Sequence, residues 1–220
     1  FGTAVKRTED RALITGRGHY VDDIRLAGTL HAAFVRSTHA HAKVRGIDAS
    51  AARALRGVHL ILTHADLPES AQKPMTLLVP NPAITQLFTP QILVKDEACY
   101  VGEPMAMVVA DSRHIAEDAA NLVEVDYEPL PAASDCLAAI APSAPRVHLG
   151  TPSNIAARIP FNHGDNDAAF AKAAHVFKES LHTHRGGPFF MECRGLVAVY
   201  DSVIDAFTVY ISCQGAHRMK

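Results

Sequence analysis

The chain has 220 residues, of which 48% are hydrophobic and 20% charged, enough apolar sequence for one large domain or two small ones. A formal net charge of −2 and the lack of tryptophan argue against a nucleic-acid or anionic-membrane surface. No apolar run approaches the roughly 20 residues of a membrane-spanning helix, and the start carries no signal-peptide pattern.

The four cysteines are widely separated in the sequence. They form no Cys-x-x-Cys pair, which argues against a zinc ribbon or an iron–sulfur cluster held by this chain alone. The simplest interpretation is a reduced, cytoplasmic protein.

In chain order, turn residues around Gly16, Gly18 and Asp22 first predict an extended N-terminal arm. Alternating and β-branched apolar residues then predict strands at 30–36, 42–48, 58–63, 105–110, 123–127, 176–182, 196–200 and 207–212. Helices are predicted at 50–55, 113–122 and 168–174. Residues 64–98 are rich in proline and predict a long covering or contact segment. The strand–helix–strand order across 105–127 indicates a mixed α/β domain.

The segment His184-Arg-Gly-Gly-Pro-Phe-Phe-Met-Glu-Cys-Arg-Gly195 combines glycines, aromatic rings, a carboxylate and a guanidinium group. It could line an apolar pocket, with Glu192 and Arg194 on one side of an extended chain. Taken alone, however, the segment is better interpreted as a turn entering a strand, with an internal Glu192–Arg194 ion pair.

Gln214 follows an apolar strand and precedes a glycine. Its amide N–H could donate to an oxo group or a ligand carbonyl, or it could cap a neighbouring backbone group. On its own sequence context, the capping role is favoured.

Two histidine pairs, His39 with His41 and His182 with His184, have the i, i+2 spacing that places both rings on one face of a strand. Neither pair has a third ligand at a clear spacing, so metal binding is not favoured. Phosphate-loop, dinucleotide-loop and nucleophile-elbow motifs do not occur.

Longer motifs occur in order along the chain: Arg7-Thr-Glu-Asp-Arg11, Leu13 to Ile24, Ala33 to His41, Tyr100 to Ala110, and Ala116 to Pro131. Together they resemble the molybdenum-carrying large subunit of the xanthine dehydrogenase and aldehyde oxidase family. The wording of His184-Arg-Gly-Gly187 and Met191-Glu-Cys-Arg-Gly195 most resembles its carbon monoxide dehydrogenase-like branch. The resemblance implies an α/β (α+β) fold: an extended arm over 1–17, an α/β hammerhead domain over 18–132, a linker over 133–149, and the beginning of a molybdopterin-binding domain over 150–220.

The resemblance also assigns roles to the C-terminal residues. Gln214 occupies the place of a family glutamine that hydrogen-bonds an oxo ligand of molybdenum, and Gly215 is expected at the cofactor's edge. Glu192 and Phe190 are expected beside the pocket, Glu192 as a structural or supporting residue. Cys193 stands where relatives carry proline, and no residue of this chain is assigned as catalytic or as a direct metal ligand.

The family's Gly-Gly-Gly-Phe-Gly-Gly-Lys loop, pterin-binding segments and catalytic base glutamate do not occur in the chain. The chain is therefore expected to be inactive alone. It would share a molybdenum-pterin cofactor, expected as the cytosine dinucleotide, with the remainder of the large subunit or a second large-subunit chain. Companion subunits would carry FAD and [2Fe-2S] clusters, in a dimer of such heteromers.

These expectations describe a molybdenum-dependent oxidoreductase that oxidises a substrate carbon with oxygen derived from water. The alternative is a non-catalytic scaffold or interaction module that keeps the hammerhead fold without a metal centre, with the proline-rich 64–98 segment as a docking surface.

Overall fold

A computed structural model describes residues 2–76, 81–86, 88–184, 186–187, 190, 192–213, 215 and 217. The chain forms two compact units. One is the continuous stretch Thr29–Asn166, and the other combines Phe1–Gly28 with Asp167–Lys220. Within the described residues, no helix has the length and apolar character needed to cross a membrane.

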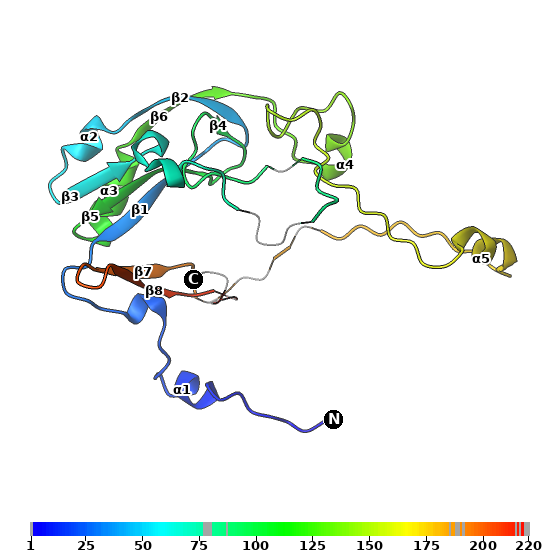
Figure 1. Ribbon diagram of the computed structural model, residues 1–220, viewed down its shortest axis with the longest axis horizontal. Helices are drawn as coiled ribbons and strands as arrows, with labels where there is room; N and C mark the ends of the chain where they lie inside the picture. The colour runs from blue at the N-terminus through cyan, green and yellow to red at the C-terminus, as the bar shows by residue number, and fades with distance from the viewer. Residues whose placement is uncertain are drawn as a thin grey trace. The chain divides into compact units, whose positions relative to one another are not determined.

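The larger unit contains two three-stranded antiparallel sheets (Figure 1). The first has β5 (Pro104–Ala110) between β1 (His31–Arg36) and β3 (Val58–Leu62). The second has β2 (Ala42–Asp48) between β4 (Glu97–Ala98) and β6 (Glu124–Pro129).

Helix α3 (Arg113–Asn121) packs on the first sheet through its small residues. Ala116 and Ala119 are fully buried, which lets the helix approach the sheet closely. The side chain of Ser112 accepts a hydrogen bond from the Ile115 N–H and begins the helix, as expected of a serine N-cap. One core joins Ala119 and Val123 to Val108 of β5 and Ile61 of β3.

A second core lies where the two sheets meet. Met105 of β5, Val94 and Ala98 are buried there, with Val44 and Val125 packed against them. Met105 and Val108 are both inaccessible to solvent, so β5 contributes to both cores and connects them.

A glycine determines the turn into β3. Gly57 has φ +89°, and a Cβ atom there would lie 3.0 Å from both Asp111 Oδ2 and Ile115 Cδ1. Its carbonyl oxygen accepts a hydrogen bond from the Asp111 N–H. Backbone conformation and close packing therefore both favour glycine at this position.

The smaller unit contains a hairpin of β7 (Leu196–Asp201) and β8 (Ala206–Ile211). Asp205 has φ +49° in the turn, and its carboxylate accepts a hydrogen bond from the Tyr200 hydroxyl at 2.9 Å. Large apolar side chains on both strands are exposed, including Leu196 and Phe207 at 60% and 70%. Exposed apolar residues of this size leave the hairpin without a core of its own.

The remaining helical elements are short. They are α1 (Asp10–Ile14), α2 (Ser50–Arg53), α4 (Cys136–Ala139) and α5 (Asn166–Lys172), with 3₁₀ turns η1 (Val21–Asp23), η2 (His64–Asp66) and η3 (Glu69–Ala71). Helix α1 lies inside the arm predicted to be extended.

The expected mixed α/β architecture is confirmed, as is the strand–helix–strand order of β5, α3 and β6. The strand predicted at 176–182 is wrong, because this stretch has no regular secondary structure and its residues are exposed. Alternation alone does not make a strand: the backbone also needs a hydrogen-bonded neighbour, and within the described residues this stretch has none.

Candidate cofactor site

The carboxylate of Glu192 connects two segments that are far apart in the sequence. Its Oε1 accepts a hydrogen bond from the Val21 N–H at 3.3 Å, and its Oε2 accepts one from the Ser212 hydroxyl at 3.1 Å. Glu192 and Val21 are both half-buried, whereas most other residues described in this unit are exposed. The sequence placed Glu192 beside the pocket but did not identify these two partners.

The local structure explains why Val21 has a free donor for this bond. Val21 begins the turn η1, and the first N–H groups of a helical turn have no partner within the turn. The turn is closed by Asp23, which accepts from the Tyr20 N–H at 2.9 Å. The Val21 N–H is therefore available to the Glu192 carboxylate, which accepts it.

Ser212 directly follows the last residue of β8. Its hydrogen bond therefore ties the end of the hairpin to the Glu192 carboxylate. Gly215 is half-buried and Cys213 is exposed. The predicted oxo-binding residue, Gln214, lies outside the described residues.

Phe190, the predicted pocket residue, has 70% of its surface exposed. The expected ion pair between Glu192 and Arg194 is not formed, because the carboxylate binds Val21 and Ser212 and the Arg194 side chain is exposed. The interpretation of this segment as an internally paired turn is therefore wrong for Glu192. Its carboxylate makes longer-range bonds instead.

Among the described residues, neither histidine pair belongs to a larger group of potential metal ligands. His39 stacks on Tyr127 with ring centroids 4.5 Å apart, whereas His41 turns to a different set of partners. His182 and His184 are both exposed. Among the described residues, no group of three or more His, Cys, Asp or Glu side chains is arranged to hold a metal ion.

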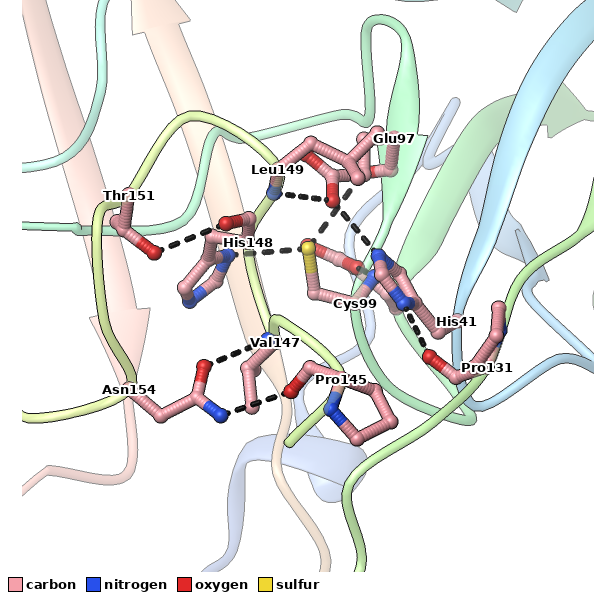
Figure 2. Close-up of polar contacts among 11 residues, drawn as sticks. His41, Glu97, Cys99, Pro131, Pro145, Val147, His148, Leu149, Thr151 and Asn154 are labelled. Carbon is pink, nitrogen blue, oxygen red and sulfur yellow. Dashed lines mark hydrogen bonds and ion pairs between the residues drawn. The ribbon is translucent and has the colours of Figure 1, made fainter. Parts of the chain in front are cut away.

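A second polar cluster, which the sequence did not predict, lies in the larger unit (Figure 2). Glu97 Oε1 accepts hydrogen bonds from the Leu149 N–H at 2.8 Å and pairs with His41 Nε2 at 2.7 Å. Close by, Cys99 Sγ lies 3.1 Å from His148 Nδ1. The cluster joins β2 and β4 to the segment around residue 148.

The electrostatics of this cluster do not favour nucleophilic chemistry. Burial, reinforced by Glu97 and Glu103, raises the pKa of the Cys99 thiol to about 12. Burial also lowers the pKa of His148, whose ring stacks on Phe88 with centroids 4.1 Å apart. A neutral thiol beside a neutral imidazole lacks the thiolate that a cysteine nucleophile requires. The cluster therefore has a structural role.

Asn154 makes further side-chain hydrogen bonds to the segment that contains His148. Its side-chain oxygen accepts from the Val147 N–H at 2.9 Å, and its amide nitrogen donates to the carbonyl oxygens of Pro145 and Ala139. The stretch predicted as a linker over 133–149 is thus tied to its own surroundings by side-chain hydrogen bonds at several points.

Comparison with known families identifies the class of protein. Residues 15–131 match the family described as aldehyde oxidase and xanthine dehydrogenase, a/b hammerhead domain. Residues 147–220 match the molybdopterin cofactor-binding domain. The chain therefore belongs to the aldehyde oxidase and xanthine dehydrogenase family, with a hammerhead domain followed by the start of a molybdopterin-binding domain.

Individual relatives agree over the whole chain. It is 40% identical to the nicotine 6-hydroxylase large subunit of Paenarthrobacter nicotinovorans, covering 100% of this chain and 26% of that one. It is 38% identical to the carbon monoxide dehydrogenase large chain of Afipia carboxidovorans, again over 100% of this chain and 28% of the relative. The chain thus spans about a quarter of the length of these relatives.

Solved structures show the same relationship. The crystal structure of quinoline 2-oxidoreductase from Pseudomonas putida 86 matches with a TM-score of 0.82 and 37% identity, over 96% of this chain and 26% of that one. A Cu,Mo-CO dehydrogenase matches with a TM-score of 0.80 and 35% identity, over 96% and 27%. The expected resemblance and its fold are therefore confirmed.

Proposed function

We propose that this chain is the N-terminal part of a molybdenum hydroxylase large subunit and has no activity alone. The observation that carries the proposal is the order of its parts. A hammerhead domain is followed by the start of a cofactor-binding domain, and the end of β8 leads directly into Ser212-Cys-Gln-Gly215.

The residues at this end are suited to a molybdenum-pterin cofactor. The amide N–H of Gln214 is a neutral donor, which can hold an oxo group without adding charge to the site. Gly215 presents no side chain, which lets the backbone approach the cofactor's edge. Phe190 would form part of an apolar wall, and its 70% exposure leaves it available for such contacts.

When bound, the cofactor would supply the oxidation of a substrate carbon with oxygen derived from water. The contribution of this chain would be to hold and orient the cofactor: Gln214 would donate to the oxo group, and Glu192 would support the segment from outside. We propose the cytosine dinucleotide form of the pterin, and a cytoplasmic location supported by four cysteines that are all free thiols.

The exposed hairpin supports a covering partner for this chain. Leu196, Phe207 and Val209 keep about half or more of their surface exposed, and such an apolar surface requires covering. We propose the remainder of the large subunit, or a second large-subunit chain, as its cover. A FAD-binding medium subunit and a [2Fe-2S] small subunit would complete each heteromer, and two heteromers would form the dimer.

Metal analysis of the native complex, combined with mass spectrometry of the chains that copurify, tests the proposal. Molybdenum together with sequence carrying Gly-Gly-Gly-Phe-Gly-Gly-Lys is the expected result. A metal-free chain of this length that copurifies with no such sequence would instead establish the scaffold function. Turnover by the purified 220-residue chain would contradict its dependence on the rest of the subunit.

A further inference from the structure

We propose that the larger unit contains a binding site for a small α-hydroxycarboxylate, in a cavity between residues 83–86 and residues 153–158. The cavity has a volume of about 410 Å³, and small-molecule sites commonly measure about 300–1,000 Å³. Its lining residues are Ala83, Thr85, Gln86, Ser153, Ile155 and Arg158. All of them lie in the continuous stretch Thr29–Asn166, so the site belongs to one unit and does not depend on the proposed function.

Hydrogen bonds hold the two walls of this cavity together. The backbone N–H groups of Thr85 and Gln86 both donate to the carbonyl oxygen of Ala156, at 3.0 and 3.3 Å. The side-chain Nε2 of Gln86 donates to the Ile155 carbonyl oxygen at 2.6 Å and to Ser153 Oγ at 2.7 Å. The walls are therefore arranged before a ligand arrives, which lowers the entropic cost of binding.

The side-chain oxygen of Gln86 is an acceptor that lacks a donor. Oε1 is buried and has no hydrogen-bond partner within the part of the chain that the structure describes. The amide orientation is settled by the Ile155 carbonyl oxygen, because that oxygen needs the NH₂ group as its donor. An unpaired buried acceptor is unfavourable, so a ligand that donates an O–H or N–H to Oε1 satisfies it.

Two other lining groups are donors. Ser153 Oγ accepts from Gln86 Nε2 and from the Ile155 N–H at 3.4 Å, so both of its lone pairs are used and its proton can be donated. Arg158 is exposed, and its guanidinium group has no hydrogen-bond or ion-pair partner among the described residues. None of the lining residues is acidic. These donors favour a carboxylate, whose two oxygens match the fork of a guanidinium group.

The acceptor and the donors together define the ligand. It needs a carboxylate for Arg158 and a neighbouring donor for Gln86 Oε1. A hydroxyl group on the α carbon supplies that donor without charge, whereas an α-ammonium group would place a second positive charge near Arg158. The apolar atoms of Ala83 and Ile155 leave room for an apolar substituent on the same carbon.

Three matched compounds test this chemistry on the full 220-residue chain. Mandelate carries the carboxylate, the α-hydroxyl and a phenyl substituent. Phenylacetate lacks only the hydroxyl, and mandelamide lacks only the charge. Dissociation constants are measured by saturation-transfer nuclear magnetic resonance, and the side-chain NH₂ signal of Gln86 is followed in the ¹⁵N-labelled chain.

The variants are Arg158→Met and Arg158→Lys. Arg56→Met is the matched control, because Arg56 is an exposed arginine of the same unit that does not line the cavity. Arg158 is also exposed, so its replacement leaves both hydrophobic cores intact. Circular dichroism verifies that each variant keeps the parent fold.

We expect saturable binding of mandelate, with phenylacetate at least about fivefold weaker and mandelamide at least about tenfold weaker. Mandelate should shift the Gln86 NH₂ signal more than phenylacetate does. Arg158→Met should weaken mandelate binding by about tenfold or more. Arg158→Lys should have a smaller effect, because lysine keeps the charge and loses the fork. Arg56→Met should bind mandelate as the parent chain does.

Several results would overturn the inference. Equal binding of mandelate and phenylacetate, or an unmoved Gln86 signal, would show that Oε1 does not receive the hydroxyl. Unchanged mandelate binding in folded Arg158→Met would place any binding elsewhere, and a parent chain that does not bind mandelate would refute the site. Inorganic phosphate that displaces mandelate at equal or lower concentration would replace the hydroxycarboxylate with a general oxyanion.

Discussion

His41 Nε2 lies 2.7 Å from Glu97 Oε1, and the opposite ring nitrogen of His41 lies 2.9 Å from the carbonyl oxygen of Pro131 (Figure 2). The carbonyl oxygen can only accept, so Nδ1 must carry a proton. The His41 ring therefore bridges the Pro131 carbonyl oxygen and the Glu97 carboxyl group at a position where only 4% of the histidine side chain is exposed.

Removing this buried pair should destabilise the chain. His41→Ala leaves the Pro131 carbonyl without its donor and Glu97 with the Leu149 N–H. We expect a loss of about 2–3 kcal/mol in the free energy of unfolding, measured with urea. The control is His59→Ala, which breaks a 2.6 Å pair with Asp111 whose side chains are about half exposed, and should cost less than about 1 kcal/mol. Equal losses in both variants would contradict the assignment.

Cys99 should be the least reactive of the four cysteines. Burial, with Glu97 and Glu103, raises the pKa of its thiol from 9.0 to about 12, so little thiolate forms at pH 8. Labelling by iodoacetamide at that pH, followed by mass spectrometry, should modify Cys99 at least about tenfold more slowly than exposed Cys136. In urea the two rates should become similar, and equal rates in the native chain would refute the prediction.

Glu103 should make stability depend on pH with a sign opposite to that of a typical carboxylate. Burial raises the pKa of Glu103 above its ordinary 4.5, although the Cys99 and Tyr100 N–H groups oppose this shift. The folded state therefore holds the proton more tightly than the unfolded state. This contribution to stability is fully present below pH 4.5 and is lost as the pH rises through the higher, folded-state pKa.

Glu103→Gln tests this sign. Glutamine can still accept the hydrogen bond that the Cys99 N–H donates at 2.6 Å, but it does not titrate. Unfolding in urea between pH 4 and 7 should show the variant gaining stability relative to the parent chain as the pH rises. A relative stability that is independent of pH, or that falls, would show that the carboxyl group is not disfavoured by burial.

Gly57→Ala should be strongly destabilising. The residue has φ +89°, and the added methyl carbon would lie 3.0 Å from atoms of Asp111 and Ile115. We expect a loss of about 2–3 kcal/mol in the free energy of unfolding, combining backbone strain with a clash. Gly102→Ala is the matched control, because Gly102 has φ +92° with no atom within 4 Å of the new methyl group. It should lose only the backbone part, about 1 kcal/mol.

Much of the larger unit was predictable because its sequence signals are local. The run from Met105 to Ala110 predicted β5, and the apolar spacing over 113–122 predicted α3. The strand predicted at 176–182 failed because apolar alternation does not specify a partner strand. The two-residue strand β4 was not predicted, since it exists only through its pairing with β2.

The sequence by itself determined the family, the order of the two domains and the candidacy of Glu192 and Gln214, because these depend on residue types in a fixed linear order. Only the tertiary structure decided what Glu192 does. Whether its carboxylate pairs with neighbouring Arg194 or with distant Val21 and Ser212 depends on which donors the fold brings within hydrogen-bond distance. The same holds for His41 and Glu97. They lie 56 residues apart in the sequence and come within hydrogen-bond distance only when β2 and β4 pair.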